Sequence, residues 1–186
     1  MKTLGPAKDT GKDQNCGAVT ALDISREGDF LVSGFEKGLI VLWDINSGYV
    51  LKNIVGISET TILSIKFYKD TKSQIITSDN AGAVNLLNVN KVIFSFTVDK
   101  QLLLHKSAGK ICGINILKSQ NNFYNSHFVR NCVLAALCSM ETILIVAIEP
   151  MAKSILKIPK PENIKEGSVP YVSWGKGAIK GRFYFN

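Results

Sequence analysis

The residues best suited to chemistry are few and far apart in this chain. Histidine, the commonest general base, occurs only as His105 and His127. His105 follows a short apolar run and His127 lies in a polar stretch, so we expect both to be ordinary loop histidines. No nucleophile, base and orienting group can be assembled around either of them. We therefore predict no catalytic residue and no enzyme activity.

Carboxylates recur near probable turns, as Asp23, Asp44 and Asp79. An aspartate at a turn usually accepts hydrogen bonds from backbone N–H groups close by in the chain. We expect that local, structural role for all three.

The four cysteines do not form a metal-binding pattern. They contain no C-x-x-C pair, and no histidine lies at zinc-finger spacing from them; they are Cys16, Cys112, Cys132 and Cys138. Four cysteines are also too few for a disulfide scaffold. We predict no metal site and a reducing, cytoplasmic compartment.

Two glycine-rich segments superficially resemble phosphate-binding loops. In the first, five residues separate Gly5 from Gly11 where a phosphate loop has four, and Asp13 replaces the Mg²⁺-binding Ser or Thr. The second, GKGAIKG near the C-terminus, lacks a strand–loop–helix context. We predict a flexible tail over residues 1–16, a solvated loop for the second segment, and no cofactor.

The net charge of +7 does not by itself indicate nucleic acid as a partner. Of 22 basic residues, 19 are Lys and 3 are Arg, whereas Arg is the usual reader of bases and phosphates. The lysines are scattered rather than gathered in a stripe. We predict no nucleic-acid partner and no small-molecule substrate, and leave open weak attraction to an acidic membrane surface or protein.

One apolar segment, CVLAALCSMETILIVAI over residues 132–148, could be mistaken for a membrane span. It is shorter than the roughly 20 residues that a bilayer requires, and Glu141 lies in its middle. Two buried strands joined by a tight turn at residues 139–142 explain it better.

The chain is organised as a repeat of short apolar runs separated by turn residues. Gly82 follows Gly38 by 44 residues, which is the period of a β-propeller blade with four strands. The expected strands of the successive units cover residues 19–25, 30–33, 39–44 and 49–52; 61–67, 74–78, 83–88 and 92–96; 111–117, 133–137, 142–146 and 154–158; and, in a unit that only begins, 169–175. No stretch has a sustained helical period. We predict an all-β fold, a partial β-propeller of three to four antiparallel WD-repeat-like blades over residues 17–186, with blades near 17–56, 57–99 and 108–159 and a further blade starting at 167–186.

The first unit ends in SGFEKGLIVLWDINSGYVL, which resembles the WD-repeat consensus. In that pattern the Trp packs between blades and its buried indole N–H donates to a hydroxyl on the preceding strand; Trp43 and Ser33 occupy these positions. The expected histidine is absent, since residues 16–18 read Cys-Gly-Ala, and Leu87 and Val146 stand where later units would carry Trp. We expect degenerate blades held mainly by apolar packing.

Three and a fraction blades cannot close a ring, and each blade buries its faces only against its neighbours. We therefore expect the chain to be a fragment of a longer protein. Expressed alone, it should aggregate or form oligomers.

Three stretches together resemble one family: residues 17–48, residues 60–91, and VPYVSWGKG over residues 169–177. They are similar to the N-terminal propeller of the eighth vacuolar protein sorting subunit, which is specific to the CORVET endosomal tethering complex. The insertion at residues 118–131 departs from that pattern. The resemblance implies a non-enzymatic interaction module of a protein peripheral on endosomal membranes, with a Rab-class small GTPase and other tethering subunits as partners. The alternative is a generic WD-repeat scaffold in another cytosolic complex.

Overall fold

The computed structural model describes residues 16–68, 73–93, 95–105, 109–118, 133–149, 153–160, 162, 170–173 and 182–185. Within these ranges every regular element is a strand, as the repeat predicts. The strands are β1 (Val19–Ile24), β2 (Phe30–Phe35), β3 (Ile40–Asp44), β4 (Val50–Ile54), β5 (Ile62–Phe67), β6 (Gln74–Asp79), β7 (Val84–Val92), β8 (Ser95–Leu104), β9 (Ile111–Lys118), β10 (Val133–Ser139), β11 (Thr142–Glu149), β12 (Lys153–Pro159), β13 (Pro170–Ser173) and β14 (Arg182–Phe185).

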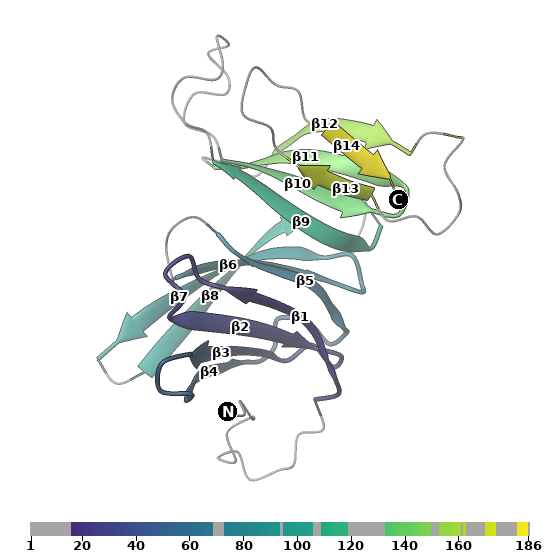
Figure 1. The fold of residues 1–186 in the computed structure, drawn as a ribbon. Helices are drawn as coiled ribbons and strands as arrows, with labels where there is room; N and C mark the ends of the chain where they lie inside the picture. The colour runs from purple at the N-terminus through teal and green to yellow at the C-terminus, as the bar shows by residue number, and fades with distance from the viewer. Residues whose placement is uncertain are drawn as a thin grey trace.

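The strands form four antiparallel sheets, each built from consecutive strands (Figure 1). The first sheet has the order β1-β2-β3-β4, the second β5-β6-β7-β8 and the third β9-β10-β11-β12, while β13 and β14 form a two-stranded sheet. The predicted all-β fold, a partial β-propeller of three to four antiparallel blades, is confirmed.

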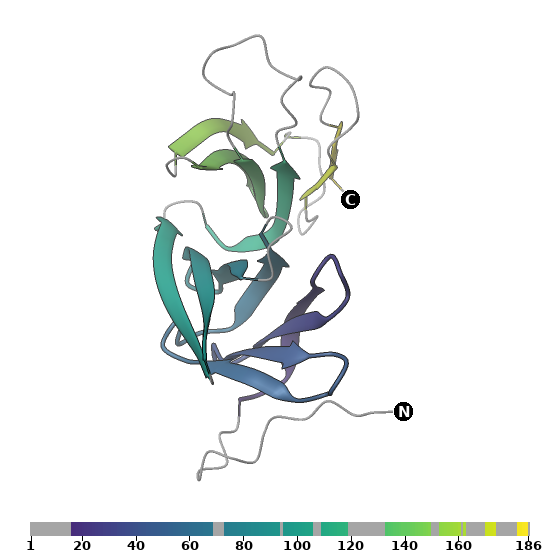
Figure 2. The same cartoon turned by 90° about the vertical axis from the view of Figure 1, so that its left-hand side faces the viewer.

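The sheets pack face to face in chain order, as the two views in Figures 1 and 2 show. Their first strands lie side by side, β1 next to β5, β5 next to β9, and β9 next to β13. Apolar side chains fill the space between neighbouring sheets: Val32, Leu42 and Ile65 lie in the core between the first and second sheets. Ile76, Ile114 and Leu137 lie in the core between the second and third.

Glycines set the turns that the repeat needs. Gly38 and Gly82, 44 residues apart, adopt φ values of +80° and +86°, which residues with a Cβ rarely adopt. Each closes the hairpin between the second and third strands of its sheet, so the sequence period is also a structural period.

The second sheet corrects the predicted strand boundaries. Its last strand was expected at residues 92–96, but β7 continues to Val92 and β8 runs from Ser95 to Leu104. Val92 pairs with Ser95 and Val84 with Leu104, so the pairing reaches both ends of the hairpin, with one irregularity between Val84 and Asn85. The pairing continues beyond the apolar run through cross-strand partners such as Asn90 and Thr97, which a short apolar run does not reveal.

The apolar segment folds as predicted over residues 133–148, the part of it that the structure describes. It supplies β10 and β11, and the turn between them is fixed by Ser139, whose Oγ accepts hydrogen bonds from the backbone N–H groups of Glu141 and Thr142. Strand β14, in the final residues, was not predicted. In the described ranges, no helix has the length and hydrophobicity needed to cross a bilayer.

Candidate functional site: contacts between the sheets

The residues considered for catalysis are not brought together. His105 is exposed and follows the end of β8, while His127, the tail at residues 1–15 and the loop at residues 175–181 lie outside the described residues. In the part of the chain that the structure describes, no three His, Cys, Asp or Glu side chains are grouped closely enough to hold a metal ion.

Two of the three turn aspartates have the predicted local role. Asp44 Oδ1 accepts a hydrogen bond from Ser47 N at 3.0 Å, and Asp79 Oδ1 accepts from Ala81 N and Ala83 N, also at 3.0 Å. For Asp23 the prediction is wrong, because its carboxylate lies on β1 and bonds to the next sheet.

Asp23 joins the first sheet to the second. Its Oδ1 lies 2.8 Å from Lys66 Nζ and its Oδ2 accepts from Phe67 N at 2.9 Å. On the same pair of strands, Thr20 Oγ1 donates to Ile62 O at 2.6 Å. These bonds fix β1 against β5, and sequence reasoning missed them because the partners are more than 40 residues apart.

A glycine permits the close approach of the same two sheets. A Cβ at Gly34 would lie 2.5 Å from Ile62 Cγ2, and Ile62 is completely buried. A larger residue at position 34 would therefore push β5 away from β2.

The second sheet is joined to the third by two polar residues. Ser78 Oγ donates to Ile111 O at 2.7 Å in a buried position. Tyr68 is completely buried, and its burial, together with the carboxylate of Glu149, raises its pKa far above the ordinary value. Beyond the third sheet, Asn115 Nδ2 donates to Val172 O, so each successive pair of sheets has both apolar and polar contacts.

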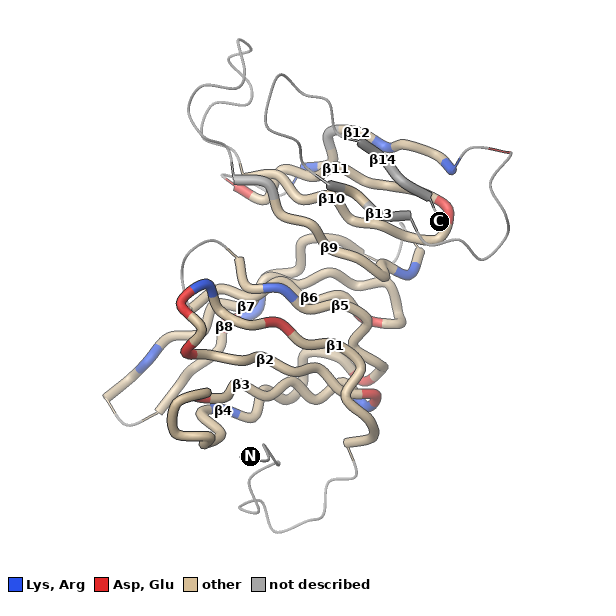
Figure 3. The backbone as a smooth tube through the Cα atoms, in the orientation of Figure 1, with Lys and Arg blue, Asp and Glu red and all other residues tan. Residues whose placement is uncertain are grey.

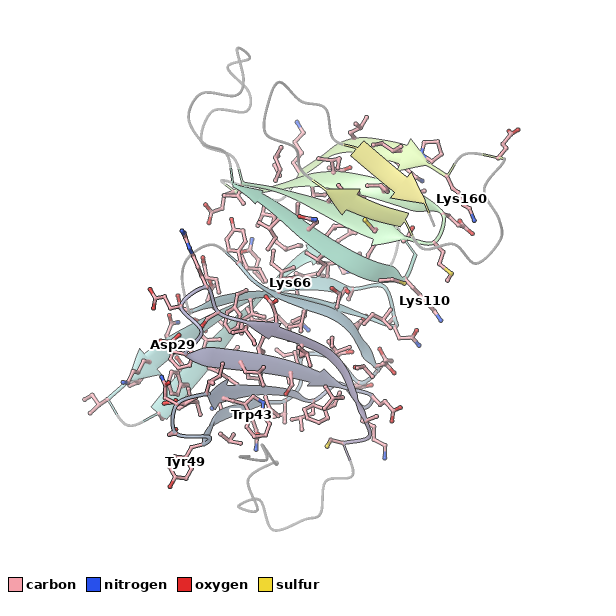
Figure 4. All side chains as sticks on the ribbon, in the orientation of Figure 1. Asp29, Trp43, Tyr49, Lys66, Lys110 and Lys160 are labelled. Carbon is pink, nitrogen blue, oxygen red and sulfur yellow. The ribbon has the colours of Figure 1, made fainter. Side chains whose placement is uncertain are left out.

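The predicted Ser33–Trp43 hydrogen bond is present. Trp43 Nε1 donates to Ser33 Oγ at 2.9 Å, with both side chains buried. Trp43 packs with Phe35 and Val41, on the face of the first sheet opposite to the core shared with the second sheet (labelled in Figure 4). The expectation that it packs between blades is not met among the described sheets, because no described sheet covers this face.

We call this surface the free face of the first sheet, because no described sheet packs on it, although Ser33, Val41 and Trp43 within it are buried. Paired residues of neighbouring antiparallel strands point to the same side. Leu22 pairs with Ser33, which pairs with Val41, and Ile24 pairs with Leu31, which pairs with Trp43. Leu22 and Ile24 therefore lie on the free face beside Trp43.

The internal repeat shows what the free face is built to contact. Leu22 pairs with Ser33 on the second strand of the first sheet. At the corresponding place in the second and third sheets, Ile65 pairs with Thr77 and Ile114 pairs with Leu137, so Ile65 and Ile114 are the equivalents of Leu22. Ile65 is 1% and Ile114 6% exposed because a preceding sheet covers each, whereas Leu22 is 58% exposed. Ile24, at 51%, is exposed beside it. The free face thus carries large apolar residues at positions that are buried against a preceding sheet elsewhere in the chain.

Cysteines and charges do not form a further site among the described residues. Cys16, Cys112 and Cys138 are free. Burial raises the pKa of the Cys138 thiol to about 11, and the neighbouring Cys112 adds to the effect. Figure 3 shows lysines and acidic residues interspersed along the strands and turns rather than gathered in a stripe.

Comparison with known proteins places these features in a family. A family model described as the Vps8 β-propeller matches residues 4–182. The chain is 32% identical over 166 residues to the human (Homo sapiens) vacuolar protein sorting-associated protein 8 homolog, covering 88% of the chain and 11% of that protein. It is also 32% identical over 160 residues to the mouse (Mus musculus) homolog, covering 85% of the chain and 11% of that protein. The chain therefore spans about a ninth of the length of these relatives.

Among solved structures, the computationally designed Ika4 protein is similar, with a TM-score of 0.53 and 18% identity. The match covers 100% of this chain and 98% of that chain. At this identity the likeness concerns the fold alone.

Proposed function

Because the chain belongs to the Vps8 β-propeller family, we propose that it is the propeller part of a vacuolar protein sorting subunit that helps to tether endosomal membranes before fusion. The observation that carries the proposal is the family match over residues 4–182, supported by relatives that are named as vacuolar protein sorting-associated proteins. We assign the subunit to a CORVET-type complex, following the resemblance of residues 17–48, 60–91 and 169–177.

We propose that residues 17–186 act as one propeller module whose free face is covered by a further sheet in the whole protein. The support is the difference in exposure between Leu22 and its equivalents Ile65 and Ile114. Leaving Leu22 and Ile24 in water forgoes about 1–3 kcal/mol of hydrophobic stabilisation, which a covering sheet would recover.

The proposed role is binding rather than catalysis. Stacked sheets hold their connecting loops in fixed positions, so the loops can present contact surfaces to other proteins. The partners we propose are the other tethering subunits and a Rab-class small GTPase, with the whole protein peripheral on endosomal membranes.

The second candidate is a WD-repeat scaffold of a different cytosolic complex. The Ser33–Trp43 hydrogen bond favours this second candidate as much as the first, since the pair is a feature of WD-repeat blades in general.

Affinity purification of the full-length protein followed by mass spectrometry tests the proposal. The expected result is recovery of the core tethering subunits, and of a Rab-class GTPase when a non-hydrolysable GTP analogue is present. A Gly34→Val variant, which disturbs the contact between the first two sheets, should lose partners that bind the propeller. The exposed Tyr49→Ser variant is the matched control. Recovery of ribosome-biogenesis or ubiquitin-ligase subunits in place of tethering subunits would support the second candidate and overturn the first.

A further inference from the structure

A groove of ≈ 520 Å³ opens where the first and second sheets meet, at the ends of their strands. Phe30, Leu42 and Leu51 of the first sheet form one wall, and Val89, Ile93 and Phe96 of the β7–β8 hairpin form the other. Its volume lies within the range of about 300–1,000 Å³ that is typical of ligand-binding pockets.

The groove is an outward continuation of the core between the two sheets. Leu42 and Val89 are 1% and 3% exposed and belong to that core. Phe30, Leu51 and Phe96 pack against the core and are only partly buried. An apolar side chain placed in the groove would therefore extend existing packing and cover surface that is now wet.

The hairpin that forms the second wall is unusually long and ends in apolar residues. Its strands have 9 and 10 residues, whereas the corresponding strands of the first sheet have 5 each. Figure 1 shows it reaching beyond the end of the first sheet. At its tip Val92 is 46% and Ile93 82% exposed, although tight hairpin turns normally carry Asn, Asp or Gly. Apolar residues at such a tip are unfavourable in water and are typical of contact surfaces.

The charges at the groove distinguish between possible occupants. Lys91 lines the groove, and among the described side chains no carboxylate lies within ion-pair distance of it. Asp44 also lines the groove, and one of its oxygens is already bonded to Ser47 N. A lipid surface is a poor match, because an anionic membrane would meet Asp44 together with a single lysine. A peptide can instead place an acidic side chain beside Lys91 and keep it away from Asp44.

We propose that this groove binds a short peptide segment of a partner protein, with bulky apolar side chains in the groove and an acidic side chain paired to Lys91. The proposal concerns the described chain itself and holds whichever complex contains the protein. The apolar anchors would supply affinity, and the Lys91 contact would set direction and specificity.

Selection from a displayed library of random dodecapeptides on the immobilised full-length protein tests the proposal. Peptides that also bind a Lys91→Glu, Ile93→Ser double variant are removed by counter-selection. We expect the enriched peptides to combine at least two bulky apolar residues with a neighbouring Asp or Glu. In fluorescence anisotropy, Lys91→Glu and Ile93→Ser should each weaken their binding at least about tenfold.

Charge reversal provides the sharpest outcome. The acidic residue of an enriched peptide is changed to Lys. This peptide should bind the wild-type protein more weakly than the original peptide does, and its affinity should recover when the protein carries Lys91→Glu. Val55→Ser, which changes a 63% exposed valine outside the groove, is the matched control and should leave affinity unchanged. Lys91 and Ile93 are exposed, so circular dichroism should show both variants to be folded.

The proposal is overturned if no peptide is enriched over the double variant, or if the enriched peptides bind Lys91→Glu as tightly as the wild type. A second result would also overturn it. The protein would sediment with phosphatidylcholine–phosphatidylserine vesicles, Ile93→Ser would abolish this sedimentation, and added peptides would not reduce it.

Discussion

Replacing Gly38 by Ala tests the contact between the β2–β3 turn and the connection that leads to the second sheet. A Cβ at this position would lie 2.2 Å from Ser58 O and 2.7 Å from Ser58 C, both backbone atoms. Gly28 offers a matched control, since it has nearly the same φ, +76° against +80°, and no atom within 4 Å of an added Cβ.

The two substitutions share one cost and differ in another. Placing Ala in the left-handed region costs about 1–2 kcal/mol at either position. Only at Gly38 must a backbone carbonyl also move, by roughly 1 Å, and such overpacking costs about 1–3 kcal/mol more. We therefore expect Gly38→Ala to destabilise this region by about 1–3 kcal/mol more than Gly28→Ala.

Hydrogen–deuterium exchange on the full-length protein measures this difference locally. Amide exchange in β3 and β5 should be faster in Gly38→Ala than in Gly28→Ala by about 5- to 140-fold, since each 1.4 kcal/mol is a factor of ten. Equal exchange in the two variants would refute the reasoning, because it would mean that the turn does not pack on the connection at Ser58.

Three further predictions concern single contacts. Ser33→Ala leaves the buried Trp43 N–H without an acceptor and should cost about 1–3 kcal/mol, visible as a lower urea midpoint; an unchanged midpoint would show that the N–H finds another acceptor. Asp23→Ala removes both the ion pair with Lys66 and the hydrogen bond from Phe67 N, so amide exchange in β5 should become faster. Asp23→Asn keeps an acceptor and should speed exchange less. Because Lys66 is 43% exposed, most of the lost stability should come from the hydrogen bond of Phe67 N. The pKa of Tyr68 in the folded protein lies above the ordinary value of 10.0, so the stability that this shift provides is complete below pH 10 and is lost as the pH rises further. Urea midpoints measured from pH 8 to 11 should show this decline. Tyr68→Phe should remove the part of the decline that is due to this residue.

Much of the fold could be predicted from the sequence because each sheet is made of consecutive strands. The 44-residue interval between Gly38 and Gly82 reports a turn that recurs at a fixed place, and the Ser33–Trp43 pair follows from neighbouring strands whose register the turn sets. These are local relations, and local patterns determine them.

The missed features depend on contacts between distant residues or on pairing beyond the apolar run. The end of β7 at Val92 and the extension of β8 to Leu104 required knowledge of which residues face each other across the hairpin. The role of Asp23 depended on the position of Phe67 in another sheet. The groove is assembled from strand ends of two sheets, so no single stretch of sequence indicates it.

The free face of the first sheet is the central element of this account, and the accessibility of Leu22 tests it most directly. In the full-length protein carrying Leu22→Cys, the rate of maleimide labelling at position 22 is compared by mass spectrometry with that of Ile93→Cys, which should be freely accessible. We predict that Leu22→Cys is labelled at least about tenfold more slowly, because the proposed covering sheet would bury it as Ile65 and Ile114 are buried here. Equal labelling at the two positions would contradict the account, since Leu22 would then be as exposed in the whole protein as it is here.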